Sequence, residues 1–186
     1  QNNLKRLVAY SSIGHIGYAL AGLAVGSNEG IQSSITYISI YIVMNLGLFS
    51  CLFMLKRNNQ YFETIEDLSG LSKNHPILSL SLLTILFSLA GIPPLAGFFA
   101  KFYIFKAVIE QSMYFLAIVG LLSTVIAAFY YLRIIKVIYF EEENEKYDSD
   151  HSIWLKMSLT ISTLLILLYF IFPSKLVEIV SRINII

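Results

Sequence analysis

The sequence predicts an all-helical polytopic membrane protein with five transmembrane spans. Hydrophobic residues make up 56% of the 186-residue chain and charged residues only 13%, about half the share found in soluble domains. Long apolar runs recur along the chain, and a double proline, Pro93 and Pro94, interrupts the third of them. We expect a single membrane domain over residues 1–186, in which the third span is a helix broken at residues 91–94 and a short interfacial helix follows the fifth span.

Residues 4–25 form the first predicted span, and its polar side chains share one arc of the helix. At 100° per residue, the polar positions are Lys5, Ser11, Ser12, His15 and Tyr18. The opposite arc is mostly aliphatic. Gly22 and Gly26 add a spacing of small residues that lets a neighbouring backbone come close. The polar arc therefore belongs against other helices.

The second predicted span covers residues 31–55 and contains no charged residue. Near its middle, Tyr41 and Asn45 lie one helical turn apart on the same face. With Ser12 of the first span, these polar side chains could hold water inside the bundle. The alternative is that they make hydrogen bonds that pack one helix against another.

The third predicted span, residues 77–105, is too long for one continuous helix. At about 1.5 Å per residue it would exceed a bilayer core about 30 Å thick. Pro93 and Pro94 lack backbone N–H groups, and Gly91 and Gly97 loosen the chain on either side. We predict two half-helices joined by an irregular segment. This segment should face the interior of the bundle, because freed carbonyl groups need partners at membrane depth.

The fourth and fifth predicted spans cover residues 113–132 and 153–172. The fourth closes with Tyr130, Tyr131 and Arg133, an aromatic and basic group typical of a membrane interface, and its helix should extend toward Tyr139. Residues 141–150 are the most acidic part of the chain. Pro173 ends the fifth span, and residues 174–186 alternate polar and aliphatic side chains at helical spacing, which favours an interfacial helix.

The basic residues predict how the spans are oriented. With five spans, one side of the membrane receives Lys5, Arg6, Lys56, Arg57, Lys73, Arg133, Lys136, Lys146 and Lys156. The other side receives only Lys106, Lys175 and Arg182. Because short cytoplasmic loops carry an excess of basic residues, the N-terminal side is predicted to face the cytoplasm or mitochondrial matrix. The C-terminus then faces the periplasm or the intermembrane space.

Lys101 is the charged residue that this topology leaves deep inside a span. All 12 carboxylates of the chain fall in loops or at span ends, so no acidic partner exists within the spans. A lysine there costs about 2.5–3.5 kcal/mol on insertion scales, and such residues commonly mark proton or ion pathways. The alternative is that Lys101 extends its ammonium group to the interface near Lys106. The adjacent proline break favours the functional interpretation.

Two further residues are candidates for proton transfer. His15 lies near the middle of the first span, and a histidine side chain can exchange protons near neutral pH. A structural histidine satisfied by hydrogen bonds is the alternative. Lys5 lies at the mouth of the same polar arc, either as an interface anchor or as a group through which protons enter.

The sequence carries no pattern of an enzyme active site. It has no glycine-rich phosphate loop, nucleophile elbow or dinucleotide fingerprint, and its histidines lack metal-ligand spacing. The single cysteine, Cys51, excludes an internal disulfide. A net charge of +1, with dispersed basic residues, argues against a nucleic-acid partner. We therefore expect no catalytic, cofactor or metal site in this chain.

Two motifs resemble a known family of membrane subunits. Residues 5–17, KRLVAYSSIGHIG, are similar to the K-R-x-x-A-Y-S-S-x-x-H-x-G segment of antiporter-like subunits. Residues 89–98, LAGIPPLAGF, with Lys101, Phe102 and Tyr103, look like the broken helix of one group among them, subunit 2 of proton-pumping NADH:ubiquinone oxidoreductase, respiratory complex I. This group is called subunit N in bacteria. The resemblance covers essentially the whole chain as the C-terminal part of such a subunit.

The resemblance implies a role in proton translocation coupled to electron transfer from NADH to ubiquinone. The chain would be a non-redox subunit of that enzyme, with flavin, iron–sulfur clusters and quinone held by partner subunits. In this family Lys101 matches the lysine of the second broken helix, and Lys5 matches the lysine that opens the preceding motif. Implied partners are the other membrane-arm subunits, lipid, and an N-terminal part of the same subunit, on the same or a separate chain.

Two alternatives remain beside this interpretation. One is a subunit of a multisubunit Na⁺/H⁺ antiporter without redox partners, and the other is a structural membrane-arm subunit without an active channel. The chain begins at Gln1 and shows no signal-peptide pattern, so we expect a fragment or a processed piece. A divided gene favours the mitochondrial inner membrane as the location over a bacterial plasma membrane.

Overall fold

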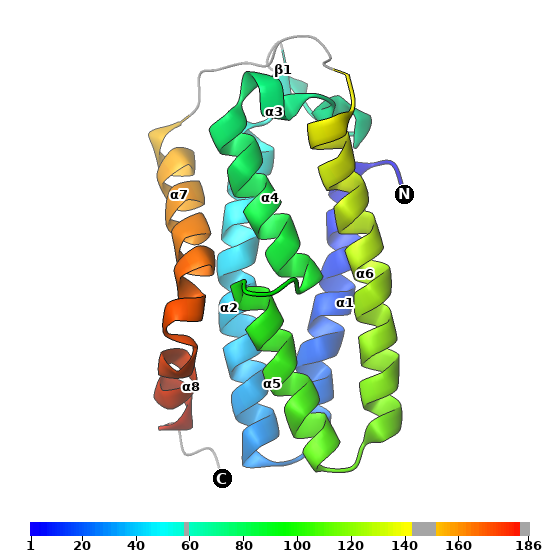
Figure 1. Ribbon diagram of the computed structural model, residues 1–186, viewed down its shortest axis with the longest axis vertical. Coiled ribbons are helices and arrows are strands. Elements are labelled where there is room, and N and C mark those ends of the chain that lie inside the picture. The colour runs from blue at the N-terminus through cyan, green and yellow to red at the C-terminus, as the bar shows by residue number, and fades with distance from the viewer. Residues whose placement is uncertain (58–59, 143–151, 183–186) are drawn as a thin grey trace.

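Long helices dominate the computed structural model, which describes residues 1–57, 60–142 and 152–182 of the chain. The helices stand side by side in one bundle (Figure 1). The longer elements are α1 (Leu4–Ala24), α2 (Asn28–Met54), α4 (Pro76–Ala90), α5 (Ala96–Glu110), α6 (Tyr114–Phe140), α7 (Ile153–Leu168) and α8 (Pro173–Ser181). The short elements are β1 (Lys56–Arg57), β2 (Gln60–Tyr61), the 3₁₀ helices η1 (Glu66–Leu68) and η2 (Tyr169–Ile171), and α3 (Leu71–Asn74).

Four of these helical segments are long and apolar enough to cross a membrane. They are Leu4–Ala24, Asn28–Met54, Tyr114–Phe140 and Ile153–Ile171. The predicted class, a helical polytopic membrane protein, is confirmed at this level. The small antiparallel hairpin of β1 and β2 departs from a purely helical chain, and it caps the end of the bundle at which α2 finishes (Figure 1).

The bundle has two ends, which are called upper and lower as they lie in Figure 1. At the upper end α1 begins, α2 finishes at Met54 and α4 begins at Pro76. At the lower end, a turn joins α1 to α2, and α5 finishes at Glu110. The described chain therefore starts at the upper end and finishes, in α8, at the lower end.

Helix α2 is the central element of the bundle, because it contacts α1, α4, α5, α7 and α8. Its contact with α1 is close: Ser34 Oγ donates a hydrogen bond of 2.8 Å to the Ala19 carbonyl oxygen. A side chain at Gly22 would meet Ser34 and the backbone of Gly30. Gly26, by contrast, has a φ of +68° in the turn between the two helices. The predicted pair of packing glycines thus contains one packing residue and one turn residue.

The chain between α4 and α5 is irregular. Helix α4 ends at Ala90, where Gly91 adopts a left-handed φ of +88° and donates its N–H to the Phe87 and Ser88 carbonyl oxygens. A cis peptide bond joins Pro93 to Pro94. Helix α5 then begins at Ala96 and continues toward the lower end, below α4 (Figure 1).

The two prolines correct one part of the sequence prediction. Both Pro93 and Pro94 are exposed in this chain, whereas the sequence predicts that the segment faces the interior. Proline has no N–H group that needs a partner, so its apolar ring can lie at the surface. The carbonyl groups at the end of α4 are the polar groups that turn inward, as described below.

The fourth and fifth predicted spans agree closely with the helices. Helix α6 ends at Phe140, one residue beyond the predicted extension to Tyr139, and α7 with η2 covers Ile153–Ile171 before α8 begins at Pro173. The acidic segment, residues 141–150, lies almost wholly outside the described residues, as do Lys146 and the last four positions of the predicted interfacial helix.

Candidate functional site

The site is built around Lys101, whose side chain is buried in the middle of the bundle. Lys101 is only 5% exposed. Its Nζ donates hydrogen bonds of 2.9 Å to the Leu89 carbonyl oxygen and 3.2 Å to the Ala90 carbonyl oxygen. These carbonyls belong to the last turn of α4, where helical carbonyl groups lack helical partners and carry partial negative charge. The ammonium group thus lies against α4 rather than extending toward Lys106.

Gly91 leaves the space that this arrangement needs. A Cβ atom at Gly91 would lie 3.1 Å from Lys101 Cδ and 3.3 Å from Lys101 Nζ. The positive φ of Gly91 also disfavours any residue with a side chain. Backbone conformation and local space therefore both call for glycine next to Lys101.

A second contact ties α4 to α5 beside the lysine. Ser88 Oγ accepts a hydrogen bond of 2.9 Å from the Gly97 N–H and donates one to Met44 Sδ at 3.1 Å. A Cβ atom at Gly97 would overlap the Ser88 backbone. Gly97 thus allows α5 to begin in direct contact with the end of α4.

An aromatic ring from α1 completes the surroundings of the lysine. Lys101 Nζ lies over the Tyr18 ring, 5.0 Å from its centroid, which is a cation–π geometry. The Tyr18 hydroxyl bonds to α6, where Thr124 Oγ1 donates to it at 2.9 Å and Ser123 Oγ lies at 3.0 Å. Among the described residues, no carboxylate forms an ion pair with Lys101.

His15 lies in a neighbouring polar cluster and is 2% exposed. Its Nδ1 is 2.6 Å from the Tyr37 hydroxyl and its Nε2 is 3.0 Å from the Tyr131 hydroxyl. The Tyr131 hydroxyl also bonds to Ser11. The Tyr41 ring stacks on the imidazole with centroids 4.7 Å apart. Both ring nitrogens therefore have hydroxyl partners inside the bundle.

Tyr18 connects the two parts of the site. Its ring meets the His15 ring edge-on, with centroids 6.1 Å apart, while Lys101 lies over its face. The structure thus brings together Lys101, His15 and Tyr41, which the sequence singled out from three different spans. It also places Gly91 and Gly97 beside them.

Three other predicted residues lie differently. Lys5 is exposed at the upper end, with its Nζ 5.8 Å from the centre of the Tyr61 ring. Ser12 donates to the Val8 carbonyl oxygen, and Asn45 donates to the Tyr41 carbonyl oxygen, so both bond within their own helices. Their role in holding water stays a prediction.

The sequence missed the tyrosine partners of His15. The sequence pattern favours Tyr131 as an interface anchor, but Tyr131 is 1% exposed and its hydroxyl group bonds to His15 and Ser11. A tyrosine at an interface and one in a polar core look alike in hydropathy. The available signal for Tyr37 was its spacing of four residues from Tyr41, which places the two on one helix face.

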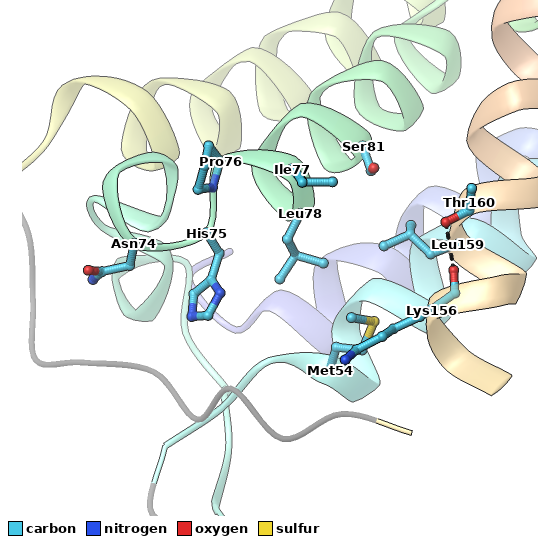
Figure 2. A pocket seen from close by; sticks show the side chains of 10 residues that line it. All are labelled: Met54, Asn74, His75, Pro76, Ile77, Leu78, Ser81, Lys156, Leu159 and Thr160. Atoms are coloured by element: carbon cyan, nitrogen blue, oxygen red, sulfur yellow. Dashed lines mark hydrogen bonds between the residues drawn. The ribbon is translucent and has the colours of Figure 1, made fainter. Parts of the chain in front are cut away.

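A separate cavity of about 410 Å³ lies at the upper end, where α2, α4 and α7 meet (Figure 2). Apolar side chains line most of it, including Met54, Leu78 and Leu159. Lys156, whose backbone accepts the Thr160 hydroxyl, extends toward Met54 at its edge (Figure 2). None of the predicted proton-transfer residues lines this cavity.

Comparison with known proteins identifies the family. A sequence model described as NADH:quinone oxidoreductase/Mrp antiporter, transmembrane, matches residues 1–127. The chain belongs to this family. The NADH-quinone oxidoreductase subunit N of Pelagibacter ubique is 87% identical over 186 residues, which are 100% of this chain and 40% of that protein. The chain thus spans about 40% of the length of this relative.

Solved structures of a respiratory complex I and an Mrp complex contain chains with the same fold. A chain of respiratory complex I from Thermus thermophilus with bound aureothin matches with a TM-score of 0.82 and 27% identity, over 96% of this chain and 40% of that chain. A chain of the Mrp complex from Dietzia sp. DQ12-45-1b matches with a TM-score of 0.84 over 97% of this chain and 42% of that chain. At 19% identity, the second likeness shows the fold alone.

The sources of these relatives bear on the predicted location. All three are bacterial, so the preference for a mitochondrial inner membrane finds no support. Membership of a transmembrane family, together with the apolar helices, makes the chain an integral membrane protein.

Proposed function

We propose that this chain is the later part of a proton-translocating membrane-arm subunit of respiratory complex I. In this role it would help to couple electron transfer from NADH to quinone with proton pumping. The observation that carries the proposal is the buried Lys101, held at the end of α4 with no carboxylate partner among the described residues. The 87% identity to a subunit N supports the choice of complex.

In this proposal α4 and α5 cross the membrane together as one broken span. Each has 15 residues, or about 22 Å of helix, which is short of a bilayer core about 30 Å thick. The chain then has five spans in a single membrane domain, and α8 lies at the interface. The hydrogen bonds from Lys101 to Leu89 and Ala90 support this reading, because they satisfy carbonyl groups that the break releases.

Lys101 would exchange protons between the hydrated centre of the assembled subunit and the outer side of the membrane. As an ammonium ion it donates to two carbonyl oxygens, and as a neutral amine it can accept a proton through its lone pair. His15 and its tyrosine partners provide a neighbouring chain of hydroxyl and imidazole groups that can pass protons. Lys5, at the upper end, would be an entry group rather than a member of this cluster.

The proposed setting follows from the sequence and the relatives. The membrane would be a bacterial plasma membrane, with the upper end in the cytoplasm because most basic residues lie there. Partners would be the other membrane-arm subunits, lipid, and the remaining part of the same subunit. Flavin, iron–sulfur clusters and quinone would be bound by those partners, and no metal or cofactor by this chain.

The test is Lys101→Ala in an intact complex, assembled with the full-length subunit in membrane vesicles. Proton pumping per NADH oxidised and the quinone-reductase turnover are measured together. We expect pumping to fall tenfold or more, since a positioned proton-transfer group typically contributes at least about that much. Unchanged pumping and turnover would show that Lys101 is not part of the proton path.

The alternative function is a subunit of a multisubunit Na⁺/H⁺ antiporter. The family itself spans both kinds of complex, and the Dietzia Mrp complex shares the fold. Copurification separates them: flavin and iron–sulfur subunits accompany a complex I subunit, whereas sodium-dependent proton exchange without them indicates an antiporter. If the chain is a structural subunit without a channel, Lys101→Ala should have no effect on proton pumping.

A further inference from the structure

Lys101 presents a problem that its two hydrogen bonds do not solve. An ammonium group has three N–H donors, and carbonyl oxygens of Leu89 and Ala90 accept only two of them. Lys101 also lines a cavity of about 460 Å³ beside α5 and α6, together with Thr124 and Phe105. The charged group therefore needs a further interaction that holds it against α4.

Tyr18 has the position and the chemistry to supply that interaction. Its ring lies under Lys101 Nζ at 5.0 Å from the centroid, and the face of an aromatic ring carries partial negative charge. The ring is itself 5% exposed, so water weakens the attraction little. This contact differs from an ion pair with a carboxylate, because a carboxylate can accept the proton of Lys101 and an aromatic ring cannot.

The Tyr18 ring is fixed from several directions. Its hydroxyl bonds to Ser123 and Thr124 of α6, and its edge meets Phe105 at a centroid distance of 6.0 Å. On the side of α2, the Tyr37 ring lies 5.9 Å from it. A ring held from α2, α5 and α6 keeps one face toward Lys101.

We propose that Tyr18 is a positioning residue whose aromatic face holds the protonated Lys101 against the end of α4. The inference rests on the proposed function, because it assumes that Lys101 carries protons. Weakening the aromatic face lets the ammonium group leave its place at the end of α4. Electron transfer then continues while fewer protons are pumped for each NADH oxidised.

The experiment lowers the partial negative charge on the ring face in steps while the ring keeps nearly the same shape. In the intact complex with the full-length subunit, Tyr18→Phe is made first, and then phenylalanines with one, two and three ring fluorines are placed at position 18. Fluorine withdraws electron density from the ring face, so the cation–π attraction weakens step by step. We expect Tyr18→Phe to retain pumping within about twofold, and the fluorinated series to lower pumping by roughly tenfold in total.

Phe53 of α2 offers a matched control, because its ring also packs edge-to-face on a tyrosine, Tyr61, at the upper end of the bundle. The same fluorinated residues at position 53 should leave pumping unchanged. Tyr18→Leu, which removes the ring, should resemble Lys101→Ala in the same assay, and NADH:quinone turnover should persist throughout.

Three results would overturn the inference. They are a flat fluorinated series, an equal decline with the series at position 53, and a complete loss with Tyr18→Phe in an assembled complex. The last result would assign the effect to the hydroxyl group. If Lys101→Ala lowers pumping and the series is flat, only the role of Tyr18 fails. If Lys101→Ala has no effect, the proposed function fails first.

Discussion

Lys101 has no carboxylate partner in the part of the chain that the structure describes, and backbone carbonyl groups and an aromatic ring hold it instead. Placing a lysine in a span costs about 2.5–3.5 kcal/mol. Each hydrogen bond from Lys101 to the Leu89 and Ala90 carbonyl oxygens involves a charged donor, and such bonds contribute about 1.5–3 kcal/mol. These two bonds and the contact with the Tyr18 ring offset the cost without an acidic side chain from the described part of the chain. The proton can therefore leave Lys101 without first breaking an ion pair.

Gly91 is the residue that makes this arrangement sensitive to a single methyl group. In Gly91→Ala, the new Cβ would approach Lys101 Cδ and Nζ to little more than 3 Å. The left-handed φ adds about 1–2 kcal/mol of strain. We expect the ammonium group to be displaced and pumping to fall nearly as far as in Lys101→Ala, as measured by proton uptake in vesicles.

Gly14→Ala serves as the matched control for this prediction. A Cβ at Gly14 would meet no atom within 4 Å, and Gly14 lies within α1 at ordinary helical geometry. Its replacement should leave pumping and assembly unchanged. Equal effects of the two substitutions would mean that the space beside Lys101 has no special role.

The sequence could predict Lys101 but not its partners. A charge in an apolar run and a double proline are local features, visible without a fold. The carbonyl groups of Leu89 and Ala90 carry no side-chain signal, and Tyr18 comes from another helix. Likewise, Tyr131 is a core residue because α6 turns that face toward α1, and hydropathy alone contains no information about that rotation.

At the scale of elements, α4 and α5 are joined by contacts as well as by the chain. Ser88 accepts from the Gly97 N–H, and a side chain at Gly97 would overlap the Ser88 backbone. Gly97→Ala must therefore separate the end of α4 from the start of α5. We expect a loss of stability of about 1–3 kcal/mol, the usual cost of overpacking, measured as a lower unfolding temperature of the purified complex.

Thr84→Val serves as the control for Gly97→Ala, because the Thr84 hydroxyl bonds within its own helix. Thr84 of α4 donates to the Leu80 carbonyl oxygen, so Thr84→Val removes a hydroxyl without touching α5. It should shift the unfolding temperature far less than Gly97→Ala. If the two shifts are equal, the contact between α4 and α5 contributes little to stability.

The lengths of the elements show where sequence reasoning succeeds and where it stops. Hydropathy placed the helices well because apolar runs mark the part of each helix inside the membrane. It ended the fourth membrane span at residue 132 and predicted that the helix extends toward Tyr139, and α6 ends at Phe140 with Ile134 and Ile138 buried. The contacts of this extension were not predicted: Arg133, for example, bonds to Asn2 at 2.8 Å. Hydropathy detects the membrane boundary, and packing determines where the helix ends.

At the scale of the whole molecule, the ends of the bundle differ in charge. Lys5, Lys56, Lys73 and Lys156 belong to elements at the upper end, whereas Lys106, Lys175 and Arg182 lie toward the lower end. By the positive-inside rule, we predict that the upper end faces the cytoplasm. Cysteine labelling can test this orientation, because Cys51 is 0% exposed and can be replaced by serine to give a cysteine-free chain.

In that background, Gln60→Cys marks the upper end and Asn28→Cys the lower end, since both positions are exposed. A membrane-impermeant maleimide should label position 60 in inverted vesicles and position 28 in right-side-out vesicles. Labelling after detergent treatment checks that each cysteine is reactive. The reverse pattern would contradict the orientation, and with it the direction of proton movement that we propose. Labelling of both positions from one side would contradict the membrane crossing itself, because α2 joins the two ends.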